Sequence, residues 1–360
     1  MAEPDFQLFS SLRYDPLLTP LSVNAEAWDG EIKHPSPFYM LPYHRDRLLQ
    51  AAENFGWTVA ADLIRGPGGF THLLKKLTET VDTQSTKPLR IRVLLSKDGT
   101  ITVEPSPTLD SSKEALYPER LPPPKSASKM KVSPLTGGAL ELGDGDSVRG
   151  DPPIDQPYEV IPDTVKTTPS PYTSYKTTSR DMYTNGRQRV GIKDFTARQE
   201  VLLVSDSGEI MEGSLTSVYF WRDGRWTTPN VASGGQIGTT RRWALEKGFC
   251  VEGVVKVDSL ADGEECWISN GVKGFLFGKI NETARPLDKS SLIDVVSSTS
   301  NKVVYPAQST STEDAQAAAD AAYSSFATGE RKDHPCLPKA PGHITQLSRH
   351  SKKLVLPAVV

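Results

Sequence analysis

Cysteine, histidine and long apolar runs are all scarce in this chain of 360 residues. The six histidines form no H-x-x-H pattern and the three cysteines lack the spacing of metal ligands. We therefore predict no metal site, and reduced thiols at Cys250, Cys266 and Cys336. The longest apolar runs cover only a few residues, which excludes a transmembrane helix, and the N-terminus shows no secretory signal. We expect a cytoplasmic protein that does not bind membranes.

The chain also lacks a strong excess of either charge and the common nucleotide-binding motifs. A net charge of −3 gives no bulk attraction to nucleic acid, so we expect no nucleic-acid partner. Neither a P-loop nor a G-x-G-x-x-G run occurs. Hydrophobic residues make up 37% of the chain and charged residues 24%, so part of its length is expected to lie outside any packed core.

The first 155 residues divide into two regions of different composition. Residues 1–105 are predicted to form a small α/β domain, because Leu48 and Phe55 lie at helical spacing and a hairpin with a turn at Asp98–Gly99 follows them. Residues 106–155 are rich in Pro, Ser and Gly. A loop of that length is rare inside a compact domain, so we predict a linker or insertion there.

The remaining residues also divide into two regions. Residues 156–282 are predicted to form a larger domain, with a helix over 178–189, a meander of strands and a second helix over 239–248. Residues 283–360 lose aromatic content and periodicity. We predict a low-complexity, disordered tail there, with at most one short helix that starts near Ser311.

Two polar residues of the larger domain suggest covalent chemistry. Lys176 could bind a carbonyl compound through its amino group, which requires a lowered pKa; the alternative is an ordinary solvated lysine. Glu212 could keep the nitrogen of a bound pyridine ring protonated; the alternative is a polar residue at a strand edge. The two residues lie 36 positions apart, so only the fold can bring them together.

Two further stretches suggest the binding of an anion. The run "GTTRR" at 238–242 places a glycine and two hydroxyls at a helix start, where backbone N–H groups attract anions. The alternative is a simple threonine cap. Arg47 lies on the first predicted helix and could hold a phosphate, or it could be an ordinary solvated residue.

The order and spacing of these groups resemble those of the class IV aminotransferases, the branched-chain and D-amino-acid aminotransferase type of pyridoxal-phosphate enzyme. "YHRDRL" is similar to the family's phosphate-arginine helix, "EIMEGSLTSVYF" to its ring-nitrogen carboxylate segment, and "GTTRRWALEKG" to its phosphate-binding helix start. "SSLRYDP" and "WISNGVKGFLFGKI" are similar to its early strand and to the loop that closes the cofactor site. The resemblance implies an α+β, two-domain fold of fold type IV, with a disordered insertion and C-terminal tail.

The resemblance also implies a role for each matching residue. Lys176 and Glu212 would be the catalytic residues, and Lys193 lies too close to Glu212 to replace Lys176. Pyridoxal 5′-phosphate would be bound by Arg47, Lys176, Glu212, Thr239, Thr240, Asn270 and Gly271.

Three other positions bear on the substrate or depart from the family. Arg13 and Arg92 are candidates to bind two substrate carboxylates, although Arg92 is equally well explained as a structural strand residue. The family's asparagine five residues after the glutamate is Ser217 here, and Tyr183 is the nearest candidate for the tyrosine that contacts the cofactor hydroxyl.

Within the family, "LRYDP" and "YKTTSRDMY" are most similar to fungal-type aminodeoxychorismate lyases. That resemblance implies a homodimeric lyase that converts 4-amino-4-deoxychorismate, a small molecule, to 4-aminobenzoate and pyruvate for folate synthesis. One alternative is a branched-chain or D-amino-acid aminotransferase on the same scaffold. Another is a degenerate, non-catalytic member that acts as a binding module, which the change to Ser217 leaves open.

Overall fold

The structure is a computed structural model. It describes residues 6–24, 35–125, 131–132, 139–140, 151–154, 156–194, 196–282, 292–297, 303–308, 346–347 and 353–356. The chain separates into two compact units, Met1–Arg285 and Pro286–Val360.

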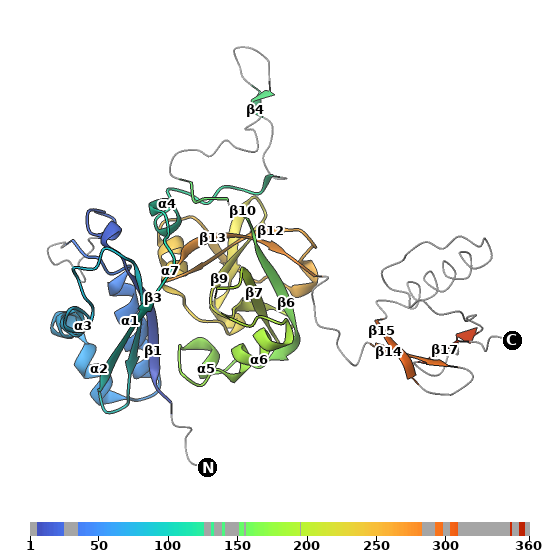
Figure 1. The fold of residues 1–360 in the computed structure, drawn as a ribbon, viewed down its shortest axis with the longest axis horizontal. Coiled ribbons are helices and arrows are strands. Elements are labelled where there is room, and N and C mark those ends of the chain that lie inside the picture. Colours follow the sequence, from blue (N-terminus) through green and yellow to red (C-terminus); the bar gives the residue numbers. More distant parts are fainter. Residues whose placement is uncertain are drawn as a thin grey trace. The chain divides into compact units, whose positions relative to one another are not determined.

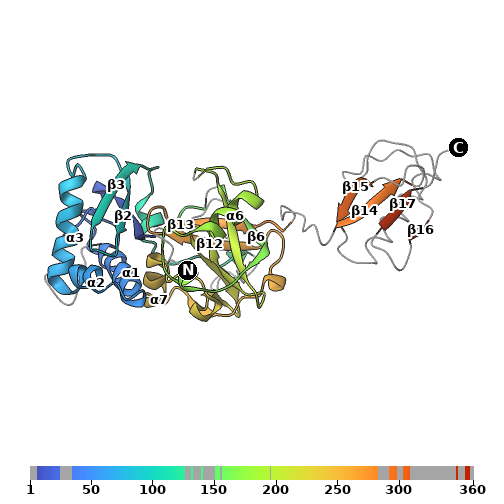
Figure 2. The ribbon, with the colours of Figure 1, turned by 90° about the horizontal axis from the view of Figure 1, so that it is seen from below.

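The first unit begins with a small antiparallel sheet that is covered by helices on one face (Figures 1 and 2). The strand order is β1 (Leu8–Tyr14), β2 (Leu89–Leu95) and β3 (Ile101–Pro107). Strands β2 and β3 form the predicted hairpin, and Gly99 adopts the positive φ of 89° that its turn requires. The covering helices are α1 (Leu41–Asn54), α2 (Thr58–Ile64) and α3 (Gly66–Thr80).

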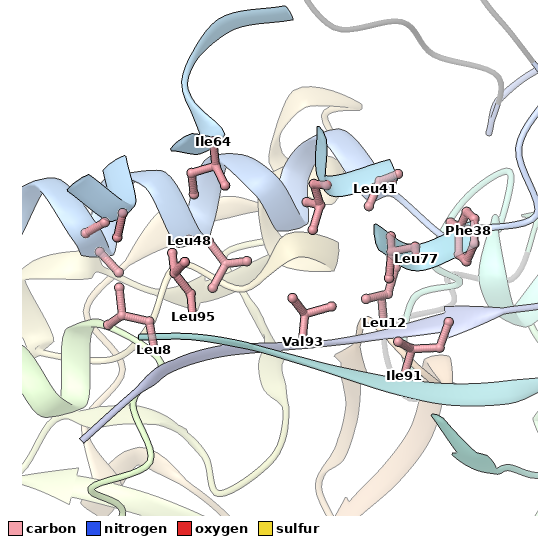
Figure 3. Packing of buried hydrophobic residues seen from close by; sticks show 14 of the residues in the cluster. Leu8, Leu12, Phe38, Leu41, Leu48, Ile64, Leu77, Ile91, Val93 and Leu95 are labelled. Atoms are coloured by element: carbon pink, nitrogen blue, oxygen red, sulfur yellow. The ribbon is translucent and has the colours of Figure 1, made fainter. Parts of the chain in front are cut away.

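Alternating residues of the strands form the core beneath these helices (Figure 3). Strand residues two apart point to the same face of a sheet, so one set of side chains meets the helices and the other set faces away. The helix-facing cluster includes Leu8, Leu12, Ile91, Val93 and Leu95 from the strands and Leu41, Leu48, Ile64 and Leu77 from the helices. The opposite face of β1 therefore remains available to the rest of this unit.

The larger part of the first unit is a curled, mixed sheet of eight strands in the order β11-β10-β9-β12-β13-β6-β7-β8 (Figure 1). The β6–β7, β6–β13 and β10–β11 pairs are parallel, and the other pairs are antiparallel. The bounds are β6 Tyr158–Thr167, β7 Gln199–Ser205, β8 Ile210–Gly213, β9 Ser217–Arg222, β10 Arg225–Pro229, β11 Val251–Gly253, β12 Glu265–Asn270 and β13 Gly274–Ile280.

Three helices connect the strands of this sheet. Helices α5 (Pro171–Ser174) and α6 (Asp181–Arg189) lie between β6 and β7, and α7 (Thr239–Glu246) lies between β10 and β11. The helices predicted over 178–189 and 239–248 are confirmed as α6 and α7, each somewhat shorter than predicted. The α+β, class IV type of fold predicted from the sequence is also confirmed.

The region predicted as a linker begins with packed structure. Helix α4 (Lys113–Leu116) is capped by Ser112, whose hydroxyl accepts a hydrogen bond from Ala115 N at 3.1 Å. Leu116, Tyr117 and Leu121 are buried in a cluster with residues of α7 and the large sheet. The burial of these apolar residues was not predicted, because the sequence around them is rich in Pro and Ser. Later in the region, β4 (Lys131–Val132) pairs with β5 (Ala139–Leu140), and most other residues up to 150 lie outside the described part of the chain.

The second unit contains a sheet with the order β15-β14-β17-β16. Its strands are β14 (Leu292–Ser297), β15 (Val303–Gln308), β16 (Gln346–Leu347) and β17 (Lys353–Leu356). These strands were not predicted. The helix expected near Ser311 lies outside the described residues, as does most of 283–360, so the disordered tail stays a prediction.

Two kinds of feature are absent from the described residues. No helix there is long and apolar enough to cross a membrane. No group of three or more His, Cys, Asp or Glu side chains in the same part of the chain is placed to hold a metal ion.

Candidate active site

The segment that carries Lys176 lies along the free edge of β1. Phe9 N donates to Lys176 O at 3.0 Å, and Thr178 N donates to Gln7 O at 2.8 Å. Thr178 Oγ1 also accepts a hydrogen bond from Gln7 N at 2.9 Å. The backbone around Lys176 thus continues the small sheet by one short stretch, which fixes the lysine between the two parts of the unit.

The Lys176 amino group lies in a strongly cationic environment. It is partly buried, and its Nζ atom lies 5.2 Å from the centroid of the Phe9 ring. Burial is the largest cause that lowers the pKa of Lys176 well below its ordinary value, and the charges of Arg180 and Arg47 lower that pKa further. Glu212 acts in the opposite direction. An amine that loses its proton readily is suited to attack a carbonyl carbon.

Glu212 lies in β8, and only 8% of it is exposed. Burial raises the pKa of its carboxyl group to about 7, against the opposing effects of the Tyr183 hydrogen bond and the Arg180 charge. The Tyr183 hydroxyl donates to Glu212 Oε1 at 2.5 Å. The carboxyl group can therefore gain or lose a proton near neutral pH.

A buried carboxylate, that of Glu200, holds the loop that follows Glu212. Its Oε1 accepts from Ser214 N at 2.9 Å and from Ser214 Oγ at 2.6 Å. Its Oε2 accepts from Leu215 N at 3.1 Å and from Thr216 Oγ1 at 2.8 Å. Charge-assisted hydrogen bonds of this kind fix the backbone where it leaves β8, and hence the direction of the Glu212 side chain.

Arg47 and His44 lie one turn apart on α1 and share Ser10 of β1. Arg47 Nη2 donates to Ser10 Oγ at 2.5 Å, and Ser10 Oγ lies 2.8 Å from His44 Nδ1. Burial lowers the pKa of Arg47 to about 10, and it also lowers the pKa of His44 well below its ordinary value. With a neutral imidazole, the Ser10 hydroxyl donates to Nδ1, and the ring hydrogen is on Nε2.

Gly271 lies directly against His44. A Cβ atom at this position would come within 2.5 Å of His44 Cε1. The adjacent Asn270 accepts hydrogen bonds at Oδ1 from Val272 N at 3.0 Å and from Lys273 N at 2.9 Å. Its side chain therefore caps the turn between β12 and β13, whereas Gly271 leaves room for the imidazole.

Thr239 and Thr240 are the first two residues of α7, and both are buried. The N-cap is Gly238, and no side chain caps this helix end. The first backbone N–H groups of a helix have no acceptor inside the helix, so they attract an anion. Thr240 Oγ1 lies 2.7 Å from Ser269 Oγ, which in turn lies 2.8 Å from the Tyr219 hydroxyl. Ser217 Oγ occupies the space where a side chain at Gly238 would lie.

The structure brings together Arg47, Lys176 and Glu212 from three distant segments. Each of them changes the pKa of another, and Arg180 acts on all three. The loop that leads to α7 also reaches this group, because Gln236 Nε2 donates to the Tyr183 hydroxyl at 3.0 Å. The rival Lys193 is exposed.

Arg13, predicted to bind a substrate carboxylate, lies near the end of β1. It is fully buried and forms an ion pair of 2.7 Å with Asp15. Its Nη1 atom donates to Leu109 O at 2.9 Å and to Val272 O at 3.3 Å. These contacts hold the guanidinium in place, and the substrate-binding role of Arg13 stays a prediction.

Arg92 lies on the face of the small sheet that is turned away from the helices. Its Nη1 atom lies 3.3 Å from Glu104 Oε2, and its Cζ atom lies 4.9 Å from the Phe9 ring centroid. Lys176 and Arg180 approach the same ring, which gathers three cations around one aromatic side chain. Arg90, two positions away on the same face, also lowers the pKa of Lys176. The substrate-binding role of Arg92 stays a prediction.

Two neighbours of the site, Arg180 and His44, were not predicted as site residues. Arg180 follows Lys176 by four residues, and that spacing was the only local signal for it. His44 lies three residues before Arg47 on the same helix face. Tyr183, predicted as a contact of the cofactor hydroxyl, has its own hydroxyl on Glu212, and its contact with the cofactor stays a prediction.

The chain is similar to known proteins over much of its length. Residues 26–279 match the family described as amino-transferase class IV. The aminodeoxychorismate lyase of Saccharomyces cerevisiae is 32% identical over 138 residues, which are 34% of this chain and 37% of the yeast protein. A Schizosaccharomyces pombe protein, provisionally named for the same activity, is 25% identical over 68% of this chain and 83% of its own length.

A solved structure from Mesorhizobium loti is provisionally named an amino-acid aminotransferase. Its sequence is 20% identical to this one, and the match covers 77% of this chain and 100% of that chain. Its TM-score is 0.49.

Proposed function

Because this chain belongs to the class IV aminotransferase family, whose members use pyridoxal phosphate, we propose that it is a lyase that converts 4-amino-4-deoxychorismate to 4-aminobenzoate and pyruvate. The observation that carries the proposal is the convergence of Lys176, Glu212 and Arg47 from three separate segments. The lyase names of the two yeast relatives support this reaction over others in the family.

The site has buried donors that fit the anionic groups of pyridoxal phosphate. Arg47 Nε, His44 Nε2 and Arg180 Nη1 are buried, and no described residue accepts a hydrogen bond from them. A buried donor without a partner costs about 1–3 kcal/mol, so a bound anion would remove a real penalty. We infer that Arg47 and the first turn of α7, with Thr239 and Thr240, hold the phosphate.

When bound, pyridoxal phosphate supplies an aldehyde carbon and an electron-withdrawing ring. With its lowered pKa, the Lys176 amino group would bind the aldehyde and, once released, would take the proton from C4 of the substrate. Glu212 would keep a proton at the ring nitrogen, which would strengthen the electron-withdrawing effect. As C4 loses its proton, the C3–O bond breaks, enolpyruvate leaves and takes up a proton, and the six-membered ring becomes aromatic.

The charge of the site suits a substrate with two carboxylates. Lys176, Arg180 and Arg92 all lie around Phe9, and Arg90 is nearby. With Arg13 held in its ion pair, these arginines are the better candidates to bind the carboxylates. A homodimer and a role in folate synthesis follow from the family resemblance and stay predictions.

The test is to supply 4-amino-4-deoxychorismate to the cofactor-loaded protein without any 2-oxo acid. A lyase restores its cofactor in each cycle, so 4-aminobenzoate and pyruvate should appear in equal amounts over many turnovers. An aminotransferase would stop after one equivalent or would require 2-oxoglutarate. A protein that neither binds the cofactor nor turns over either substrate would be a non-catalytic binding module, and either outcome would overturn the proposal.

A further inference from the structure

The hydroxyl of Tyr183 has more neighbours than one hydrogen atom can serve. It lies 2.5 Å from Glu212 Oε1 and 3.1 Å from the backbone oxygen of Thr173, and it accepts from Gln236 Nε2 at 3.0 Å. Only 1% of Tyr183 is exposed. A phenol has one hydrogen to donate and lone pairs to accept, so its hydrogen must go to either Glu212 or Thr173.

The choice between these acceptors depends on the charge of Glu212. An ionised carboxylate can only accept, so the phenol hydrogen then points to Oε1 in a charge-assisted bond. A protonated carboxyl group can donate to the phenol oxygen instead, and the phenol hydrogen then turns to the Thr173 carbonyl. The phenol and Glu212 stay hydrogen-bonded to each other in both states, and Gln236 donates to the phenol oxygen in each. The Thr173 carbonyl receives the phenol hydrogen only in the second state.

We propose that Tyr183 is a positioning residue that holds Oε1 of Glu212 in both charge states and leaves the second oxygen, Oε2, for the ring nitrogen of the cofactor. The hydrogen bond from Tyr183 is the only one that a described side chain makes to Glu212. The part of this inference that concerns the cofactor rests on the proposed function, whereas the contact with Glu212 does not.

The Tyr183 ring is itself held in place. Arg180 Cζ lies 3.8 Å from its centroid, and Arg180 Nη2 donates to Ser214 O at 2.7 Å, in the loop that follows Glu212. Burial raises the pKa of the Tyr183 hydroxyl well above its ordinary value, so the phenol keeps its hydrogen at any working pH. A fixed, permanently protonated phenol fulfils the requirements of a positioning group.

The charged groups that face Glu212 come from several elements. Lys176 precedes α6, Arg180 caps that helix, and Arg47 comes from α1. Their charges favour the ionised carboxylate, as do the Tyr183 hydrogen bond and the backbone N–H of Gln236, whereas burial opposes it. Burial outweighs these effects, so the loss of one hydrogen bond that favours the carboxylate should raise the pKa of Glu212 further.

The experiment follows the titration of Glu212 in the full-length, cofactor-free protein. Carbon-13 NMR of glutamate-labelled protein gives the carboxyl signals, and the signal missing from Glu212→Gln identifies this residue. In Tyr183→Phe, the midpoint should rise by about one pH unit, a tenfold change in proton affinity. Tyr172→Phe, in which the ring packs against Phe6 and Phe55, is the matched control and should keep the wild-type midpoint.

An unchanged midpoint in Tyr183→Phe would overturn the positioning role. The affinity for pyridoxal phosphate, measured by fluorescence titration, separates this result from the fate of the proposed function. Weaker binding in Tyr183→Phe than in Tyr172→Phe, together with the shifted midpoint, supports the whole inference. If the wild-type protein binds no pyridoxal phosphate, the proposed function fails and the assignment of Oε2 fails with it, even where the midpoint moves.

Discussion

Replacing Glu212 with glutamine is expected to remove a pH dependence from the stability of the cofactor-free protein. Burial raises the pKa of Glu212 from 4.5 to about 7, so between these values the folded chain holds a proton that the unfolded chain has released. The stabilisation from this proton is fully present below pH 4.5 and is lost as the pH rises through about 7. Glutamine carries no such proton, so Glu212→Gln should not show this loss.

The size of the effect follows from the difference between the two pKa values. A shift of about 2.5 units corresponds to about 3 kcal/mol in the free energy of unfolding, at about 1.4 kcal/mol per unit. Relative to the wild type, Glu212→Gln should therefore gain about 3 kcal/mol as the pH rises from about 4.5 to about 8. That is a large part of a typical domain's stability, so urea denaturation at several pH values will resolve it.

The quantity to compare is the difference in the free energy of unfolding between the wild type and Glu212→Gln. Lys176 lies in the same cluster and also contributes to the pH profile of each protein, so neither profile alone reports on Glu212. Glu79→Gln, at a half-exposed position of α3, is the control and should follow the wild-type curve at every pH. A constant difference between wild type and Glu212→Gln across this range would refute the reasoning, since Glu212 would then have no elevated pKa in the folded protein.

Three further predictions concern other parts of the chain. Borohydride reduction of the cofactor-loaded protein, followed by peptide mapping, should place the label on Lys176 and not on Lys193; a label on Lys193 would end the assignment. Gly271→Ala places a methyl group against an imidazole ring and should weaken cofactor binding at least tenfold by fluorescence titration, whereas Gly68→Ala, in open space, should bind normally. Removal of residues after 290, a separate compact unit, should leave a soluble protein of unchanged melting temperature; insoluble protein would show that the tail is needed.

Local elements of the fold could be predicted because their signals lie within a few residues. The helical spacing of Leu48 and Phe55 places them in and just after α1, and the Asp98–Gly99 turn forms between β2 and β3 as expected. The packing of 113–121 was missed because its apolar residues are embedded in a Pro-rich run. Composition averages over a window, whereas burial depends on each side chain.

The site itself could be predicted as a set of segments but not as a geometry. The partner of Tyr183 is 29 residues away and that of Gln236 is 53 residues away, so no spacing rule connects them. For Arg13, in contrast, the sequence did contain a signal that identifies its partner. Residues two apart on an extended chain share a face, so Asp15 was a ready ion-pair partner for this arginine.

The pairing of the Lys176 segment with β1 determines when the lysine becomes reactive during folding. Gln7 and Thr178 are 171 residues apart, so their hydrogen bond closes a very long loop. Loop closure of this kind is entropically costly and slow, and it follows the formation of local helices and hairpins. Until the loop closes, Lys176 lacks the burial and the neighbouring arginines that lower its pKa, and its amine is as inert as any surface lysine. The pairing thus restricts the lowered pKa of Lys176 to the folded protein.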